Sequence, residues 1–288
     1  MATTIKQGFQ QLKANLEITE LQQQTVSSRQ QNIRDAVAAD LTVLDTFLTG
    51  SYRRSTMIAP LKDADIDVFV VLDVSYFNQD GQAWLLDKVK TTLKRTYPTT
   101  PKISRNGQAV TITFTDFTVD VVPAFNRKGG GYLIADSVNV RWIATDPKKH
   151  VDIWSTANAT HQGNLVPLIK MMKAWNRQNG ALLRSFHLES MTLEILDKVT
   201  INDFSSGSRF VFDKARQMVK SATYDPSGYD GNLADYLNTQ QKISDVVSRL
   251  ETAYSRAVEA ESLERQGKTY LAVDKWRLIF GDYFPAYG

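Results

Sequence analysis

The sequence predicts an α+β fold, because its strand-like and helix-like segments occupy different parts of the chain. Short apolar runs with β-branched residues gather in residues 41–122, whereas apolar residues recur at helical spacing from about residue 161 onward. A run of strands followed by a run of helices is typical of α+β proteins. We therefore expect a mixed or antiparallel sheet with helices at residues 41–150, a helical lobe with a short C-terminal tail at residues 151–288, and a cleft between them.

Residues 1–40 are polar, rich in glutamine and free of proline. Thr19 and Gln22 have the spacing of a capping box, in which each side chain bonds the backbone N–H of the other residue. Four apolar residues recur at roughly helical steps: Leu21, Val26, Ile33 and Val37. The segment is therefore predicted to form an N-terminal spine of two helices, or of one long broken helix.

The rest of the chain divides into strands and then helices. The predicted strands are residues 41–48, 66–72, 109–117 and 118–122. Residues 80–97 have a helical pattern that ends at Pro98 and puts four apolar residues on one face: Trp84, Leu85, Val89 and Leu93. Residues 127–131 are rich in glycine and are expected to form a turn or mobile loop. Further helices are predicted at residues 161–178, 186–199, 208–221 and 235–264.

The composition excludes several classes of protein. Of the 288 residues, 42% are apolar and 23% charged, and 34 Lys and Arg against 31 Asp and Glu give a net charge of +3, too small to indicate nucleic-acid wrapping. The absence of cysteine excludes disulfides and thiol nucleophiles. The three histidines are not spaced like a metal site, so any metal should be a hard cation on carboxylates. Because no apolar signal core or membrane-length run is present, we expect a cytoplasmic protein with no membrane partner.

Three features that carry chemistry stand in order along the chain. Gly50 and Ser51 follow a predicted strand and should open a helix. Asp65 and Asp67 stand two apart as the chain enters an apolar strand, and Asp120 lies inside a later apolar strand. Carboxylates in such strands need a partner, because burying an unpaired charge is costly.

The spacing of the acidic residues indicates a metal site. Residues two apart on a strand project from the same face, so Asp65 and Asp67 repel each other unless a divalent cation lies between them. Asp120 on a neighbouring strand could complete a two-metal site, which favours in-line displacement at a phosphoryl group. The Ser51 hydroxyl and the backbone N–H groups of the Gly50–Ser51 turn would then hold terminal phosphates.

This constellation resembles the nucleotidyltransferase superfamily that includes DNA polymerase beta, whose signature is Gly-Ser, a pair of acids and a third acid on a later strand. Residues 165–177 and 183–190 resemble the helical half of the oligoadenylate synthetase and cGAS branch. Residues 50–56, 65–68 and 120–125 match the bacterial cGAS/DncV-like nucleotidyltransferases (CD-NTases) best. The resemblance implies a polymerase-beta-like catalytic core beside a helical nucleotide-binding lobe, with the active site in the cleft.

The resemblance also implies roles for individual residues. Asp65, Asp67 and Asp120 would hold two Mg²⁺ or Mn²⁺ ions. The nucleotide-binding residues would be Gly50, Ser51, Lys170, Lys173, Ser185 and Phe186. Among these, Ser51 would contact the γ-phosphate, the two lysines would reach the triphosphate, Ser185 would bond the donor base and Phe186 would stack on it. A solvated basic face for the lysines and core packing for Phe186 are the alternatives, and His187 and Glu189 are expected to be structural.

The implied reaction transfers a nucleoside monophosphate from an NTP, with ATP expected among the substrates, to a 2′- or 3′-hydroxyl and releases pyrophosphate. In CD-NTases a linear dinucleotide then closes into a cyclic di- or trinucleotide that acts as a second messenger in anti-phage (CBASS) defence. The family also suggests a ubiquitin-activating-like or other regulatory operon partner, acting through Gly288. Nucleic-acid binding is not required.

Three alternatives remain at this stage. One is a template-independent RNA nucleotidyltransferase of the CCA-adding or poly(A) type, although the net charge of +3 is weak for gripping RNA. Another is a small-molecule nucleotidyltransferase, and the third is a nucleotide-binding protein without activity. The retention of Asp65, Asp67 and Asp120 argues against the third alternative.

Overall fold

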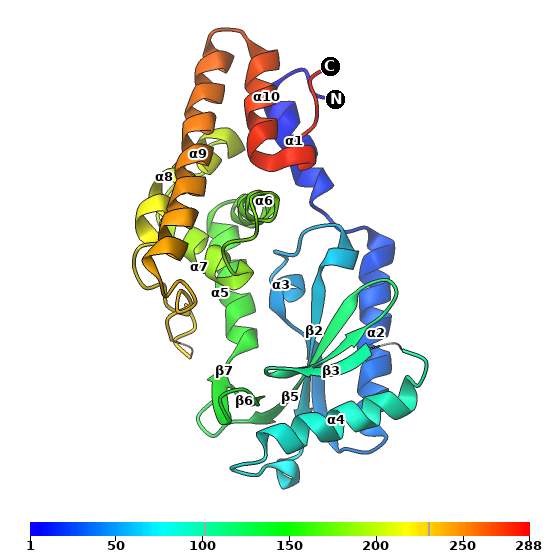
Figure 1. Cartoon of the computed structure of the whole chain (residues 1–288). Coiled ribbons are helices and arrows are strands. Elements are labelled where there is room, and N and C mark those ends of the chain that lie inside the picture. The colour runs from blue at the N-terminus through cyan, green and yellow to red at the C-terminus, as the bar shows by residue number, and fades with distance from the viewer. Residues whose placement is uncertain (101, 230) are drawn as a thin grey trace. The chain divides into compact units, whose positions relative to one another are not determined.

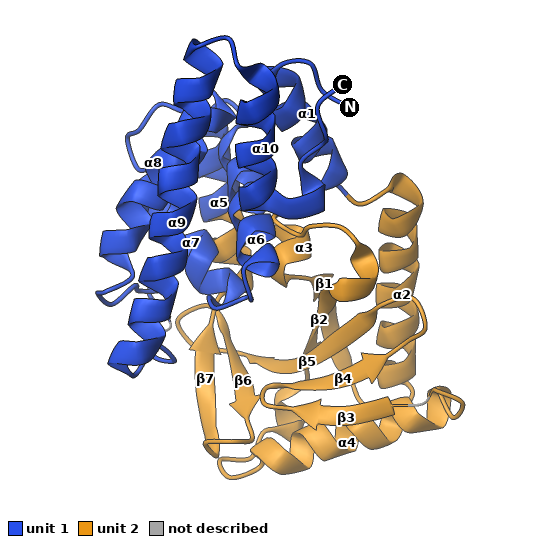
Figure 2. Ribbon diagram, turned by 45° about the horizontal axis from the view of Figure 1, so that its top comes forward, with its two compact units in different colours: residues 1–17, 153–288 blue, residues 18–152 orange. Residues whose placement is uncertain are grey.

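The computed structural model describes residues 1–100, 102–229 and 231–288. The chain folds into two compact units, which Figure 2 shows in different colours: a sheet unit of residues 18–152, and a helical unit of residues 1–17 and 153–288. This division describes how the chain packs. It does not test the functional division predicted from the sequence, which stays a prediction: residues 1–40, 41–150 and 151–288.

The sheet unit contains one mixed sheet, which in the described residues has seven strands. The central strands are β2 (Asp65–Leu72) and β5 (Thr118–Asn126), which run parallel, whereas the other pairs are antiparallel. The strand order is β1-β2-β5-β4-β3, with β6 and β7 continuing from the far end of β5. The outer strands are β1 (Val43–Leu48), β3 (Lys102–Asn106), β4 (Ala109–Thr113), β6 (Tyr132–Asp136) and β7 (Arg141–Thr145). This confirms the predicted mixed sheet, and residues 127–131 form the predicted turn between β5 and β6.

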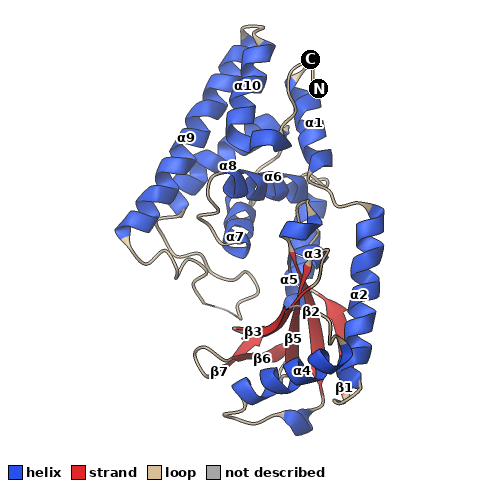
Figure 3. Cartoon of the chain, turned by 45° about the vertical axis from the view of Figure 1, so that its right-hand side comes forward, coloured by secondary structure: helices blue, strands red, loops and turns tan. Residues whose placement is uncertain are grey.

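Two long helices, α2 (Glu20–Ala38) and α4 (Gln82–Thr96), pack on one face of this sheet (Figure 3). Thr19 and Gln22 form the predicted capping box at the start of α2. The predicted apolar faces were partly wrong, because Leu21 is 73% exposed and Trp84 is 51% exposed. Leu86 lies with the buried residues of α4 in place of Trp84, beside the correctly predicted Leu85, Val89 and Leu93.

The side chains of the central strands alternate between an apolar core on one face of the sheet and polar residues on the other. Ile66, Val68 and Val70 of β2 join the core under α2 and α4, together with Val119 and Val121 of β5. The intervening residues project from the opposite face, because successive side chains of a strand alternate. On that second face a smaller cluster, which includes Phe69, Val71, Val122 and Ala124, lies further along the same two strands.

The helical unit is built around α6 (Leu165–Gln178), which is buried along most of its length. The other helices, labelled in Figure 1, are α1 (Ile5–Asn15), α7 (Ser185–Ile195), α8 (Phe204–Met218), α9 (Gln240–Arg265) and α10 (Thr269–Phe280). The boundary between the units falls inside α5 (Pro147–Thr160). The sequence prediction found α6 to α9 but missed α5 and α10, and it began α9 too early, because residues 235–239 belong to a loop.

An aromatic cluster joins the first and last helices of the helical unit. The ring of Phe9 in α1 lies 4.8 Å from that of Trp276 and 5.2 Å from that of Phe284, all three being buried. The chain ends also pair, since the backbone N–H of Ala2 donates to the carbonyl of Ala286 at 2.9 Å and that of Gly288 donates to Ala2 at 3.4 Å. No helix in the described residues is both long and apolar enough to cross a membrane.

Candidate active site

The three predicted carboxylates occupy one end of the second face of the sheet. Asp67 and Asp120 stand directly opposite each other on the parallel strands β2 and β5. Asp65 precedes Asp67 by two residues and therefore projects from the same face. Thr111 of β4 stands opposite Asp120 on its other side, and its hydroxyl donates to the Asp120 carboxylate at 2.5 Å. The sheet thus brings a row of oxygen-bearing side chains together across three neighbouring strands.

The electrostatics of this row are those of crowded acids. Burial raises the pKa of the Asp65 carboxyl above its usual value. Burial also raises the pKa of Asp120, with a further contribution from the negative charge of Asp65, while the hydrogen bond from Thr111 acts in the opposite direction. A bound cation would stabilise the ionised form of each of these carboxyl groups, because an opposite charge nearby favours the charged form.

The donor set fits a hard divalent cation, because such ions prefer carboxylate oxygens. Within the residues that the structure describes, no group of three or more His, Asp or Glu side chains is gathered closely enough to hold a metal ion. The assignment of two metal ions to Asp65, Asp67 and Asp120 therefore stays a proposal.

Gly50 is required by the close approach of the Asp67 side chain. It begins the four-residue helix α3 (Gly50–Arg53) with φ +60°, a conformation that glycine adopts readily. A Cβ atom at this position would lie 1.7 Å from Oδ2 of Asp67. The backbone N–H groups of Thr56 and Met57 donate to the carbonyl of Ser51, which fixes the turn. The predicted helix start at Gly50–Ser51 is confirmed.

Replacing Gly50 by alanine is expected to destabilise the sheet unit more than the same change at Gly107. Both glycines have a positive φ, +60° and +61°, so both substitutions incur the backbone strain, about 1 kcal/mol. Only at Gly50 does the new methyl group overlap Asp67, because nothing lies within 4 Å at Gly107. Urea unfolding of both variants measures the difference, and equal losses of unfolding free energy would contradict this account of Gly50.

The two predicted lysines lie in the helical unit, on α6, and each forms a charged pair there. Lys170, 6% exposed, donates to Glu17 at 2.7 Å. Lys173, 7% exposed, donates to Glu189 of α7 at 2.8 Å, and Glu189 is completely buried. Neither lysine therefore lies on a solvated basic face. Their contact with a triphosphate stays a prediction.

Ser185 and Phe186 are the first two residues of α7. Ser185 is exposed. Phe186 is half-buried and stacks on Trp154, with ring centroids 5.7 Å apart and planes 24° apart. His187 is buried between Thr223 and Tyr236, with which its two ring nitrogens form hydrogen bonds. The predicted roles of Ser185 and Phe186 toward a base stay predictions.

The sequence analysis did not assign a role to Thr111, nor did it identify Glu17 as a partner for Lys170. Thr111 lies on the polar side of an alternating strand, between Val110 and Ile112. That alternation marked it as facing away from the core, but its pairing with Asp120 depends on strand register, which one sequence does not provide.

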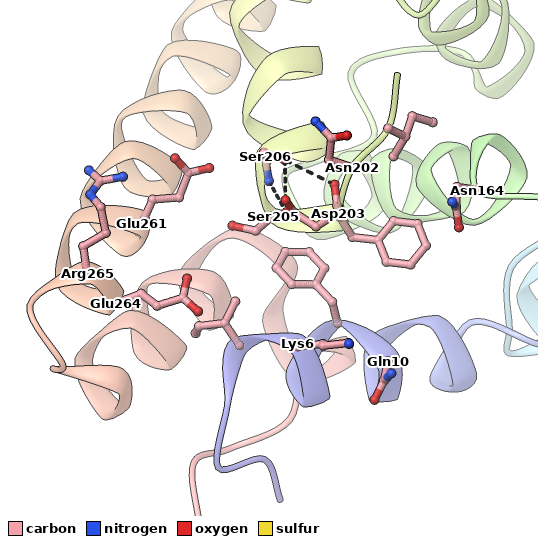
Figure 4. Close-up of a pocket in the computed structure, with 14 residues that line it drawn as sticks. Lys6, Gln10, Asn164, Asn202, Asp203, Ser205, Ser206, Glu261, Glu264 and Arg265 are labelled. Carbon is pink, nitrogen blue, oxygen red and sulfur yellow. Dashed lines mark hydrogen bonds between the residues drawn. The ribbon is translucent and has the colours of Figure 1, made fainter. Parts of the chain in front are cut away.

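A separate cavity of about 640 Å³ lies within the helical unit, between α1, the start of α8 and the end of α9 (Figure 4). None of the predicted site residues lines it. Two of its acidic side chains have structural partners, since Asp203 caps α8 by accepting from Ser206 and Glu261 accepts from Arg209. The cavity therefore lies apart from the candidate chemistry.

Comparisons with known proteins show the family to which the chain belongs. The family model of the Second Messenger Oligonucleotide or Dinucleotide Synthetase domain matches residues 3–158. A probable cyclic nucleotide synthase of Bacillus cereus (strain VD146) is 29% identical over 274 residues, which cover 83% of this chain and 81% of the relative. The cyclic AMP-AMP-AMP synthase of Acinetobacter sp. (strain ATCC 27244 / 9458) is 26% identical over 298 residues, covering 98% of this chain and 86% of the relative.

Solved structures show the same fold. CdnC of Escherichia coli MS115-1, in a structure with ATP, has a TM-score of 0.79 and 17% identity, covering 98% of this chain and 99% of that chain. The DncV cyclic AMP-GMP synthase of Vibrio cholerae has a TM-score of 0.70 and 19% identity, covering 97% and 87%. The predicted polymerase-beta-like α+β fold is thereby confirmed. Because the family model matches more than half of its length, the chain belongs to the Second Messenger Oligonucleotide or Dinucleotide Synthetase family, the CD-NTase nucleotidyltransferases that its motifs predicted.

Proposed function

We propose that the protein is a metal-dependent nucleotidyltransferase that joins NTPs into a cyclic di- or trinucleotide second messenger and releases pyrophosphate, in the cytoplasm and in bacterial anti-phage (CBASS) signalling. The observation that carries the proposal is the pairing of Asp67 with Asp120 on adjacent parallel strands, with Asp65 on the same face. Relatives named as cyclic nucleotide synthases, one of them a cyclic AMP-AMP-AMP synthase, support the product class.

In this proposal Asp65, Asp67 and Asp120 hold two Mg²⁺ or Mn²⁺ ions. When bound, such ions neutralise phosphate charge and favour ionisation of the attacking hydroxyl. The chain's own contribution is to hold the carboxylates rigidly on the sheet, where Thr111 orients Asp120. Preorganised positioning of this kind supplies much of the catalysis of phosphoryl transfer.

The substrate contacts are proposed on the predicted residues. Ser51 contacts the γ-phosphate, and Lys170 and Lys173 bind the triphosphate. To do so, the two lysine ammonium groups would exchange the carboxylates of Glu17 and Glu189 for phosphate oxygens. Ser185 bonds the donor base, and Phe186 stacks on it. An exposed hydroxyl at the first residue of α7 suits this role, because its oxygen is accessible to a ligand.

The proposal is tested by incubating the purified protein with all four NTPs and Mg²⁺ or Mn²⁺, followed by phosphatase treatment and mass spectrometry. We expect a phosphatase-resistant cyclic oligonucleotide that is absent with EDTA and absent from the Asp65→Ala/Asp67→Ala variant. Nucleotide added to a supplied RNA would instead identify the template-independent RNA enzyme. Failure to release pyrophosphate from any NTP would contradict the enzymatic proposal.

Replacing Thr111 by valine is expected to lower kcat about 10- to 100-fold, because a hydrogen bond to a charged group contributes about 1.5–3 kcal/mol. The side-chain shape is kept, so only the bond that orients Asp120 is lost. Thr113→Val is the matched control, since Thr113 projects from the same face of β4 but stands opposite Thr118. Equal kcat values for the two variants in a pyrophosphate-release assay would contradict a positioning role for Thr111.

The regulatory partner is also a proposal. The family resemblance suggests conjugation through Gly288 by a ubiquitin-activating-like partner, and a structure of CdnC from Escherichia coli MS115-1 contains a HORMA protein. In the structure the backbone N–H of Gly288 donates to the carbonyl of Ala2, whereas conjugation would use the carboxylate of Gly288. Unchanged conjugation after deletion of Gly288, in the presence of such a partner, would exclude this attachment point.

A further inference from the structure

The start of α7 is held by side chains from the loop between α8 and α9. Arg184, the residue that precedes this helix, provides no side-chain cap to it. Its own backbone N–H donates instead to the hydroxyl of Tyr236 at 2.9 Å. Its guanidinium group lies 4.4 Å above the Tyr236 ring and donates to Asp235 at 2.9 Å. Three contacts therefore tie this one residue to the loop.

The same hydroxyl begins a chain of hydrogen bonds through His187. Nδ1 of His187 lies 2.9 Å from the Tyr236 hydroxyl, and Nε2 lies 3.1 Å from Oγ1 of Thr223. Because the N–H of Arg184 can only donate, the Tyr236 hydroxyl accepts there while it also bonds Nδ1 of His187. Nε2 bonds the Thr223 hydroxyl at the same time, so both ring nitrogens are held and the orientation of the imidazole is fixed. Burial, with a smaller contribution from the charge of Arg184, lowers the pKa of His187 to about 4, which agrees with a neutral ring.

The loop is itself held in place at this point. Thr223 is 1% exposed, and its backbone N–H donates to the Asn232 side chain at 3.1 Å. Its carbonyl accepts from the N–H of Leu233 at 2.7 Å. The same Asn232 oxygen accepts from Ala234 at 3.0 Å, two residues before Tyr236. The two residues that contact His187 are therefore connected by hydrogen bonds within the loop, two of them made by the Asn232 side chain.

We propose that Tyr236, His187 and Thr223 form a positioning cluster that fixes the backbone at Arg184–Phe186 and thereby sets which nucleobase the protein accepts. The inference rests on the proposed function, in which Ser185 and Phe186 meet the donor base. Ser185 directly follows the residue bonded by Tyr236, and Phe186 directly precedes His187. None of the three residues touches the base in this proposal, so they act through the position of α7. A small displacement of a polar group is enough to lose a hydrogen bond that discriminates between bases.

Tyr236→Phe tests the proposal, because it removes only the hydroxyl shared by Arg184 and His187. We expect the ratio of kcat/KM values between the preferred and the next-best NTP to fall about tenfold, which is the effect of one lost hydrogen bond. The change should arise mainly from KM. Direct titration of each NTP in the absence of turnover should show the same loss of selectivity. Tyr224→Phe is the matched control, since Tyr224 lies in the same loop and is 67% exposed.

A second pair of variants keeps the test valid if Tyr236→Phe does not fold. Thr223→Val removes the hydroxyl that holds Nε2 of His187, whereas Thr223→Ser retains it. We expect Thr223→Val to lower base selectivity, whereas Thr223→Ser should keep the selectivity of the wild type. Folded variants with wild-type selectivity, or with a lower kcat at unchanged selectivity, would overturn the positioning role while leaving the proposed function in place. Wild-type protein that neither binds nor turns over any NTP would overturn the proposed function, and this inference with it.

Discussion

Asparagine in place of Asp67 is expected to lower kcat on the order of a thousandfold. No other single substitution is expected to reduce the rate as much. The amide has almost the shape of the carboxylate, so it can occupy the same space beside Gly50. It lacks the negative charge opposite Asp120 that the proposed metal ions require. Metal ions contribute several kcal/mol to phosphoryl transfer, and each 1.4 kcal/mol is about tenfold in rate.

Asp63→Asn is the matched control for this experiment. Asp63 is exposed and lies in a short turn (Leu61–Asp63) just before β2. Its replacement by asparagine therefore makes the same chemical change outside the proposed metal site. Both variants should unfold at the wild-type temperature, and only Asp67→Asn should stop pyrophosphate release at saturating NTP and Mg²⁺. An Asp67→Asn enzyme with kcat within tenfold of wild type would exclude a metal-binding role for this residue.

The second large effect is expected on stability, from Glu189→Gln. Glu189 is completely buried, and its carboxylate accepts from the nearly buried ammonium group of Lys173. The neutral amide removes the negative charge that this buried ammonium group contacts, and breaking a buried ion pair in this way typically costs about 3–5 kcal/mol. We expect the thermal unfolding temperature of the helical unit to fall on the order of 10 °C in differential scanning calorimetry.

A double variant separates the structural role of Lys173 from its proposed role in binding. Replacing both partners by apolar residues of similar size, as in Lys173→Met/Glu189→Leu, is often neutral for stability because no charge stays buried. This variant should recover most of the unfolding temperature and still bind NTPs weakly, since the proposed triphosphate contact is absent. Full nucleotide affinity in the stable double variant would exclude Lys173 from the binding site.

The acidic row was predictable from the sequence because its residues break a pattern. Asp67 and Asp120 interrupt runs that are otherwise apolar, and strand alternation then puts Asp65 on the same face. The contacts that orient and balance the charged groups were not predictable. Glu17 and Lys170 are far apart in the sequence, and the pairing of Thr111 with Asp120 depends on register.

The fold was predictable where an element is long or strongly apolar. α2, α4, β2 and β5 all satisfy this, and their existence was predicted. The strands β3, β6 and β7 have five residues each, and β3 and β7 include exposed polar positions, so their pattern is too short to stand out from a loop. Trp84 was assigned to one apolar face together with Leu85, Val89 and Leu93, but a residue directly before Leu85 lies about 100° away around the helix, and Trp84 is 51% exposed.

The aromatic cluster between α1 and α10 has a consequence for the order in which the chain folds. The sheet unit is one unbroken stretch, residues 18–152, whereas the helical unit is closed by Phe9 packing on Trp276 from the other end of the chain. Contacts between such distant segments have the larger loop-closure entropy and form late. Because α1 also packs on α6 and α8, only the part of its apolar face that meets α10 stays unburied until α10 has left the ribosome, by which time the sheet is complete. α1 thus precedes the sheet in the chain but completes its own packing after it.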